Sequence, residues 1–280
     1  MGEVEGRGLG LLATQDLQPG DLVLQDLPLF IVPDSAQGPG LDQYLADCVT
    51  RLEPAERQQF FSLADCKTED GKKTVRGIYF TNCYTLGSHP ASPTAMLPRL
   101  SRVNHSCRPN TEFHWDAAAG REELRAARPV RAGEELTDCY LDLTAAGRET
   151  RAARRALLRG GYGFWCHCAA CDVTPEEAEA EDALRQEALQ LAEVTEKDGS
   201  EALARAERLL ELRSQLGYKA VHQLEAVEAV FNLALLAGRL DRAMAVAATA
   251  VQLARVREGE GETMEMWRER SRDPVRAIMG

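Results

Sequence analysis

Three cysteines crowd into six positions in the second half of the chain, and they constrain its fold more than any other feature. They are Cys166, Cys168 and Cys171 in the segment Cys-His-Cys-Ala-Ala-Cys. Such a run can place three thiolates around one zinc ion, which prefers four ligands in a tetrahedron. The fourth ligand must come from elsewhere, so a bound ion would tie two parts of the chain together. Four thiolates would leave no open position, and the site would be structural.

The spacing alone does not identify the fourth ligand. His167 lies inside the cluster, where it would be sterically awkward between two adjacent ligands. The remaining thiols are Cys48, Cys66, Cys83, Cys107 and Cys139. An isolated cysteine is more often a small buried apolar side chain than a ligand. Eight cysteines in 280 residues are too few for a disulfide scaffold, and metal-binding thiols indicate a reducing compartment. We expect a nuclear protein, a cytoplasmic one, or one found in both places.

Charge and hydropathy limit the class of partner. The chain has 33 Lys and Arg against 44 Asp and Glu, a formal net charge of −11. This balance argues against direct nucleic-acid binding, because affinity for phosphates rests largely on Lys and Arg displacing counterions. It favours a basic protein or peptide partner. No segment approaches the roughly 18 consecutive apolar residues of a membrane span, and residues 1–15 contain no signal-type apolar run. We expect a soluble monomer without membrane association.

Short strands and tight turns are predicted in much of the first part of the chain. Leu17-Gln18-Pro19-Gly20-Asp21 is a turn signal, and it precedes a short buried-strand pattern at Leu22-Val23-Leu24. A similar turn pattern recurs at residues 130–136. Both are typical of a mainly β domain.

The β pattern is interrupted by a helical insertion at about 41–75. Apolar residues there recur at helical spacing, and they are Leu41, Tyr44, Leu45, Cys48 and Leu52. Pro54 lies where a second helix can begin. Residues 75–85 are rich in aromatic residues and are predicted to return to β structure. Residues 87–98 contain three prolines and are predicted to form a loop.

The pattern becomes wholly helical from Thr174. Thr174-Pro175-Glu176-Glu177 supplies an N-cap hydroxyl, proline at the first helical position and glutamate at the third. Gly199-Ser200, Gly217 and Gly238 then separate segments of helical period. Gly199 and Gly238 lie 39 residues apart and precede similar Ala-rich segments. These features predict helical hairpins loosely similar to tetratricopeptide repeats.

Five motifs occur in a recognisable order. They are Gly8-Leu9-Gly10, Thr81-Asn82-Cys83-Tyr84, Asn104-His105-Ser106-Cys107, Gly133-Glu134-Glu135-Leu136-Thr137-Asp138-Cys139-Tyr140 and the cysteine cluster. In this the chain resembles the SET-domain protein-lysine methyltransferases, most closely the SET-and-MYND branch.

The resemblance implies an α+β fold. A SET-type β domain of short strands would cover residues 1–172, with the helical insertion at about 41–75 and a zinc-binding post-SET segment at 162–172. An all-α, tetratricopeptide-like domain would follow over 173–280. Segments 104–110 and 136–141 would pass through each other in a knot-like crossing, an exception to the usual absence of threaded loops.

The resemblance also implies ligands for a metal and a cofactor. One structural Zn²⁺ would be held by Cys107, Cys166, Cys168 and Cys171. S-adenosylmethionine would be bound by Arg7, Gly8, Leu9, Gly10, Asn82, Asn104, His105, Tyr140 and Phe164. The glycine segment would lie along the methionine part of the cofactor, and Phe164 would cover the adenine.

The implied reaction is transfer of a methyl group from this cofactor to a lysine of a histone or non-histone protein. In-line transfer requires alignment of the amine, the carbon and the leaving sulfur. Tyr140 would be the catalytic residue, orienting the lysine nitrogen and favouring loss of its proton. Tyr84, Tyr140 and Tyr162 would wall the substrate channel. The alternative is an inactive SET scaffold that binds a protein partner through its helical domain.

The chain departs from its relatives in three places. Residues 34–75 contain only Cys48 and Cys66 where the related branch inserts a MYND zinc finger, so we expect no second metal site. Asp138 and Cys139 precede Tyr140 where apolar or hydroxyl residues are usual, which alters the pocket wall. The acidic residues between 176 and 182 are interpreted as a solvated first helical turn, in preference to a surface that attracts substrate.

Overall fold

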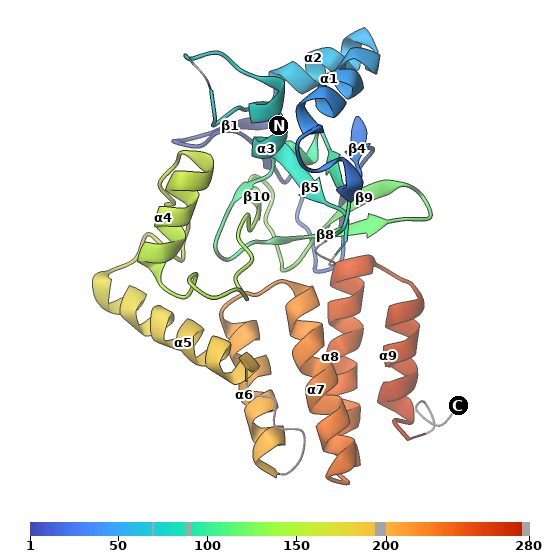
Figure 1. The fold of residues 1–280 in the computed structure, drawn as a ribbon. Coiled ribbons are helices and arrows are strands. Elements are labelled where there is room, and N and C mark those ends of the chain that lie inside the picture. The colour runs from blue at the N-terminus through green and yellow to red at the C-terminus, as the bar shows by residue number, and fades with distance from the viewer. Residues whose placement is uncertain (69, 88–90, 194–199, 276–280) are drawn as a thin grey trace.

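Figure 1 shows a computed structural model of the protein, with short strands and helices in one part and long helices stacked side by side in the other. The structure describes residues 1–68, 70–87, 91–193 and 200–275. Within these residues the strands form three small sheets, with orders β1-β2-β10-β7, β3-β9-β8 and β4-β6-β5. The strands are β1 (Gly2–Val4), β2 (Gly8–Leu12), β3 (Leu22–Asp26), β4 (Phe30–Val32), β5 (Cys83–Thr85), β6 (Thr94–Met96), β7 (Asn104–His105), β8 (Thr111–Asp116), β9 (Arg121–Ala126) and β10 (Glu135–Asp138). The predicted α+β class is confirmed.

Strand β10 brings together segments that are distant in the sequence. It pairs antiparallel with β2 and parallel with β7, placing Thr137 opposite Asn104 and Asp138 opposite His105. The N–H of Ser106 then donates to the carbonyl of Asp138 at 2.7 Å. The chain just after β7 is therefore fixed beside the end of β10, and Cys107 and Tyr140 follow directly from these two strands.

Helices α1 (Leu41–Arg51) and α2 (Pro54–Ser62) confirm the predicted insertion. The apolar spacing of α1 buries Leu41, Leu45 and Val49 on one face. A reciprocal capping box between Glu53 and Glu56 begins α2, with Pro54 at its first position. The helical spacing of apolar residues predicted these helices correctly because one face of each helix packs on a common core.

The β structure predicted for residues 75–85 is wrong over most of its length. Helix α3 (Val75–Asn82) occupies the segment, and only Cys83–Thr85 form a strand. The Thr74 hydroxyl accepts the N–H of Gly77 at 2.9 Å, which caps the helix. Ile78 and Tyr79 are buried in the core formed with α1 and α2. Tertiary burial on one helical face therefore outweighs the β propensity of these residues.

Two further differences concern strands. Strand β6 lies within the predicted 87–98 loop, where pairing with β4 and β5 on both sides stabilises it; Pro90 of that loop lies outside the described residues. The strand predicted at 22–24 is present in β3, but Leu22 is exposed and not buried.

The helical part consists of α4 (Arg151–Tyr162), α5 (Pro175–Glu193), α6 (Ser200–Gln215), α7 (Ala220–Leu236), α8 (Leu240–Glu258) and α9 (Glu262–Arg272). Helices α5 to α9 pack in sequence order, each against the next (Figure 1). Gly217 and Gly238 adopt positive φ after α6 and α7, as expected of helix-terminating glycines. Gly199 lies outside the described residues. Hairpins are therefore present, while the domain boundary at 172–173 stays a prediction.

The Thr174 cap supports a first stability prediction. Its hydroxyl accepts the N–H of Glu177 at 3.2 Å, and its own N–H donates to the Glu177 carboxylate at 3.0 Å. Thr174→Ala should lower the free energy of unfolding by about 1 kcal/mol, because the first turn loses an N-cap acceptor. Urea unfolding followed by circular dichroism measures this change. Thr249→Ala, on an exposed part of α8, is the control and should be neutral within about 0.5 kcal/mol. Equal midpoints for wild type and Thr174→Ala would contradict the prediction.

Candidate functional site

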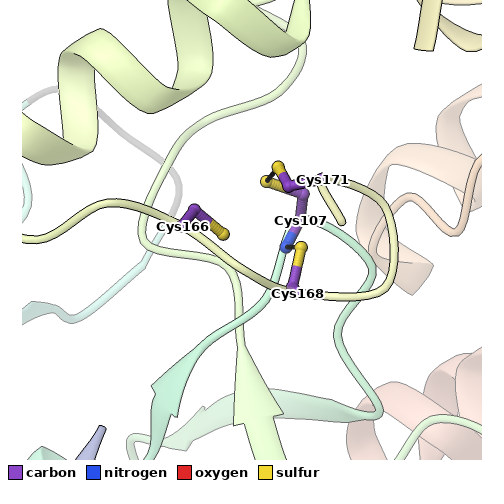
Figure 2. Close-up of side chains that lie close together, drawn as sticks. All are labelled: Cys107, Cys166, Cys168 and Cys171. Atoms are coloured by element: carbon purple, nitrogen blue, oxygen red, sulfur yellow. Dashed lines mark hydrogen bonds between the residues drawn. The ribbon is translucent and has the colours of Figure 1, made fainter. Parts of the chain in front are cut away.

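Four cysteine sulfurs converge where the chain after β7 meets the segment after α4. The Sγ atoms of Cys107, Cys166, Cys168 and Cys171 all lie within 4.8 Å of one another, and all four residues are buried (Figure 2). The Sγ atoms of Cys107 and Cys171 are 3.7 Å apart. Thiolates at the corners of a tetrahedron around zinc are separated by about 3.8 Å. The four sulfurs therefore fit one structural Zn²⁺, and the exposed His167 is not among them.

Arginines of α4 hold the cysteine segment in place. Arg155 donates through Nε to the carbonyl of Cys166 at 2.9 Å and through Nη2 to that of Cys171 at 3.0 Å. Arg154 is fully buried. Burial opposes its charge, but the sulfurs of Cys107 and Cys171, together with the carboxylates of Glu181 and Asp182, outweigh that effect and raise the pKa of Arg154. A cationic helix thus faces the excess negative charge of four thiolates around a divalent ion. The sequence analysis missed these arginines because helical spacing does not reveal what a helix packs against.

His105 links the cysteine cluster to Tyr140. Its Nδ1 accepts the backbone N–H of Tyr140 at 3.0 Å, and its Nε2 lies 3.3 Å from Sγ of Cys107. Burial lowers the pKa of His105 to about 4, so the ring is neutral, with its proton on Nε2 because Nδ1 is an acceptor. Both ring nitrogens are engaged within the protein. The predicted part of His105 in cofactor binding stays a prediction, and its evident task is to position Tyr140.

A cleft of about 900 Å³ unites most of the predicted site residues. Those in its wall are Arg7, Gly8, Leu9, Asn82, Tyr84, Asn104, Tyr140, Tyr162 and Phe164. Gly10 and His105 are not among the residues that line the cleft. Most of the residues predicted to bind the cofactor or to wall the channel therefore line one continuous space.

Tyr140 lies at the centre of an aromatic group in this cleft. Its ring centroid is 4.9 Å from that of Tyr162 and 6.4 Å from that of Phe164. Its hydroxyl donates to the carbonyl of Val103 at 2.7 Å. Burial, reinforced by the charge of Asp138, raises the pKa of Tyr140. The phenol is therefore neutral near pH 7, and the hydrogen bond that it donates to Val103 fixes its orientation. Its oxygen can still accept a hydrogen bond from an incoming amine.

Tyr84 and Tyr162 complete the aromatic wall. The Tyr84 hydroxyl donates to the carbonyl of Leu100 at 2.9 Å, and its ring packs edge-on against Phe113 at 5.0 Å between centroids. Burial raises the pKa of both tyrosines. Neutral aromatic faces of this kind suit an aliphatic stem with a cationic end, which is the shape of lysine.

The N-terminal glycine segment is anchored by Glu135. Its carboxylate forms an ion pair with Arg7 and accepts the Asn104 side-chain amide at 2.8 Å. Arg7 also donates to the carbonyl of His105. A Cβ at position 10 would lie 2.8 Å from Cγ2 of Val4 and 2.9 Å from both the Asn104 amide nitrogen and the Glu135 carboxylate oxygen, so any larger residue would displace these side chains. The sequence analysis included Glu135 in a motif but assigned it no role, because its partners lie far away in the sequence.

Asn82 uses both of its side-chain N–H groups within the protein. Its amide nitrogen donates to the carbonyls of Ala64 and Ile78, each at 2.7 Å. Both N–H groups are therefore used within the protein, and the side-chain carbonyl oxygen is the atom left to contact a ligand. Its predicted role in cofactor binding stays a prediction that rests on this oxygen.

The helical part contributes a wall of the cleft that the sequence did not predict. Lys219, which precedes α7, forms an ion pair with Asp138 at 2.6 Å. The N–H of Ala220 donates to the Glu112 carboxylate at 3.0 Å. The unusual acidic residue before Tyr140 therefore has a partner in the helical part, and this pair completes the far side of the cleft.

The acidic start of α5 agrees with the interpretation of a solvated turn at three of its five acidic residues, whereas Glu181 and Asp182 are paired and mostly buried. Glu181 forms ion pairs with Arg108 at 2.8 Å and with Arg185 at 2.7 Å. Asp182 accepts the N–H of Arg151 at 2.7 Å. These two carboxylates connect α5 to its neighbours and are not free to attract a substrate, while Glu176, Glu177 and Glu179 are exposed.

Comparison with known proteins identifies residues 8–141 as a match to the SET domain family. The histone-lysine N-methyltransferase set5 of Schizosaccharomyces pombe is 23% identical over 186 residues, covering 66% of this chain and 54% of that protein. Mouse histone-lysine N-methyltransferase SMYD3 is 39% identical over 84 residues, covering 30% and 18%. Human protein-lysine N-trimethyltransferase SMYD5 is 29% identical over 151 residues, covering 52% and 34%.

These matches confirm the resemblance to the SET-and-MYND branch. They cover about half of the yeast relative, about a third of SMYD5 and less than a fifth of SMYD3. Among the described helices, none has both the length and the apolar character needed to cross a bilayer.

Proposed function

We propose that the protein is an S-adenosylmethionine-dependent protein-lysine N-methyltransferase, because residues 8–141 match the SET domain family. The observation that carries this proposal is a single cleft with two kinds of wall. Arg7 and Asn104 line one part of it, and the tyrosines Tyr84, Tyr140 and Tyr162 line the other. The relatives named as histone- or protein-lysine methyltransferases support the same activity. The protein would act as a monomer on a basic protein substrate, in the nucleus if that substrate is a histone.

S-adenosylmethionine would supply an electrophilic methyl group on a sulfonium. On the protein side, Arg7, Asn104 and the backbone of 8–10 would hold its amino-acid part, while Phe164 would cover its adenine. The Tyr140 oxygen would accept a hydrogen bond from the lysine nitrogen and keep its lone pair aligned with the methyl carbon. Tyr84 and Tyr162 would exclude water around the lysine stem.

Incubation of the purified protein with labelled S-adenosylmethionine and a histone mixture or cell proteome tests the activity. Labelled lysine in a protein substrate, detected after hydrolysis, would establish it. Calorimetry measures whether the protein binds S-adenosylmethionine, and so distinguishes an active enzyme from the inactive scaffold considered as the alternative. A folded, zinc-loaded protein that binds no cofactor would favour an inactive scaffold.

Glu135 provides a prediction about the cofactor side of the site. Glu135→Ala should weaken binding of S-adenosylmethionine about tenfold, because Arg7 and Asn104 lose the carboxylate that holds them both. Isothermal titration calorimetry measures the affinity. Glu3→Ala is the control, since Glu3 is exposed on the neighbouring strand β1. Unchanged affinity in Glu135→Ala would show that the cofactor does not depend on this anchor.

A further inference from the structure

Glu122 is a buried carboxylate in the wall of the cleft. It lies on β9 opposite Trp115 of β8, and only 4% of its surface is exposed. Its Oε2 has no hydrogen-bond partner within the described part of the chain. Leaving such an oxygen buried and unpaired is costly, and a native protein has a reason to retain it.

The neighbouring charges do not satisfy Glu122. The charge of Lys219 in the wall acts on Glu122, but the Nζ of this lysine is engaged by Asp138 at 2.6 Å. Glu112 has its own partner in the N–H of Ala220. Arg257, which also lines the cleft, pairs with Glu258 at 3.5 Å. This side of the cleft thus has three carboxyl groups near one lysine. The lysine pairs with Asp138 and the Ala220 N–H with Glu112, while Oε2 of Glu122 has neither as a partner.

We infer that Glu122 is a binding subsite for a second cationic side chain of the substrate, an arginine or lysine that flanks the methylated lysine. This inference rests on the proposed function, since it supposes that a peptide occupies the cleft. The incoming cation would supply the missing hydrogen bond, and burial would make the pair strong because few waters compete for either group.

Peptides with one central lysine test the subsite. An arginine is placed in turn at each flanking position of an otherwise neutral peptide, and each peptide is matched by one carrying citrulline, the uncharged analogue, at that position. At one or more positions, replacing arginine by citrulline should weaken binding to the wild-type protein about tenfold or more. Binding is measured by calorimetry with S-adenosylhomocysteine present, so the readout does not depend on methyl transfer.

Glu122→Gln should abolish the preference for arginine over citrulline and leave binding of the citrulline peptide unchanged. Glu123→Gln is the matched control, because Glu123 is the next residue on β9, pairs with Arg125 outside the cleft, and loses the same charge. It should retain the preference. The citrulline comparison on the wild-type protein needs no variant, so a folding defect in Glu122→Gln would not remove the test.

A proton measurement adds an independent readout. Burial, with the charges of Asp138 and Glu123 opposed by Lys219, raises the pKa of Glu122 to about 8. Asp26, opposite Glu122 on β3, is held by the backbone N–H groups of Arg99 and Leu100. A bound cation lowers the pKa of Glu122, so arginine peptides should release a proton near pH 7.5 and bind more tightly as the pH rises toward 8. Calorimetry in buffers of different ionisation enthalpy detects this release, which citrulline peptides should lack.

The outcomes separate the two proposals. Arginine-dependent binding that Glu122→Gln abolishes, in a protein that methylates neither the peptides nor the histone mixture and proteome, would support the subsite and contradict the proposed activity. Methyl transfer with equal binding of arginine and citrulline peptides at every position would overturn the subsite and leave the activity standing. Failure of every arginine peptide to bind would also overturn it.

Discussion

Cys107→Ser is expected to abolish metal binding and to lower the free energy of unfolding by about 4 kcal/mol or more. Cys107 is the ligand that comes from the segment after β7, while the other three follow α4. Because metal binding in such sites is coupled to folding, loss of this ligand removes the connection between two distant segments. Metal content by mass spectrometry and urea unfolding measure the two effects.

The control for the metal site is Cys48→Ser. Cys48 lies on α1, is half-buried and does not contact the four-cysteine cluster. It should retain one zinc per chain and unfold within about 1 kcal/mol of wild type. A Cys107→Ser protein that keeps a full equivalent of zinc would show that Cys107 is not a ligand. Wild-type protein without zinc, purified under reducing conditions, would contradict the metal site itself.

Tyr140→Phe should reduce methyl transfer about 100-fold or more, while cofactor affinity stays within a few-fold of wild type. The substitution removes the hydroxyl that donates to Val103, and with it the oxygen positioned to accept a hydrogen bond from the amine. The ring that packs against Tyr162 remains. Single-turnover kinetics and calorimetry with S-adenosylmethionine separate the two effects.

Tyr218→Phe is the matched control for Tyr140→Phe. The Tyr218 hydroxyl also donates to a backbone carbonyl, that of Leu143 at 3.1 Å, but Tyr218 does not line the cleft. Transfer by this variant should remain within a few-fold of wild type. Equal transfer by Tyr140→Phe and wild type would exclude Tyr140 from its assigned role.

Local signals in the sequence predicted those parts of the fold that depend on neighbouring residues. The apolar spacing of Leu41, Leu45 and Val49 predicted α1, and Thr174 with Glu177 predicted the start of α5. The same kind of reasoning failed for 75–82, where β-type residues form a helix because Ile78 and Tyr79 find a core on one face. Local propensity differs between helix and strand by less than about 1 kcal/mol per residue, so tertiary burial decides such cases.

The sequence by itself determined which chemical groups the protein has: the Cys-x-Cys-x-x-Cys run, the Asn-His-Ser-Cys motif and the tyrosines predicted to wall the channel. Only the tertiary structure decided their partners. It showed that His105 positions Tyr140, that Glu135 anchors Arg7, and that Lys219 pairs with Asp138. These contacts join residues between 35 and 128 positions apart. No local pattern encodes such pairs, because hydrogen bonds and ion pairs act over a few ångströms, and only the folded chain brings these residues that close.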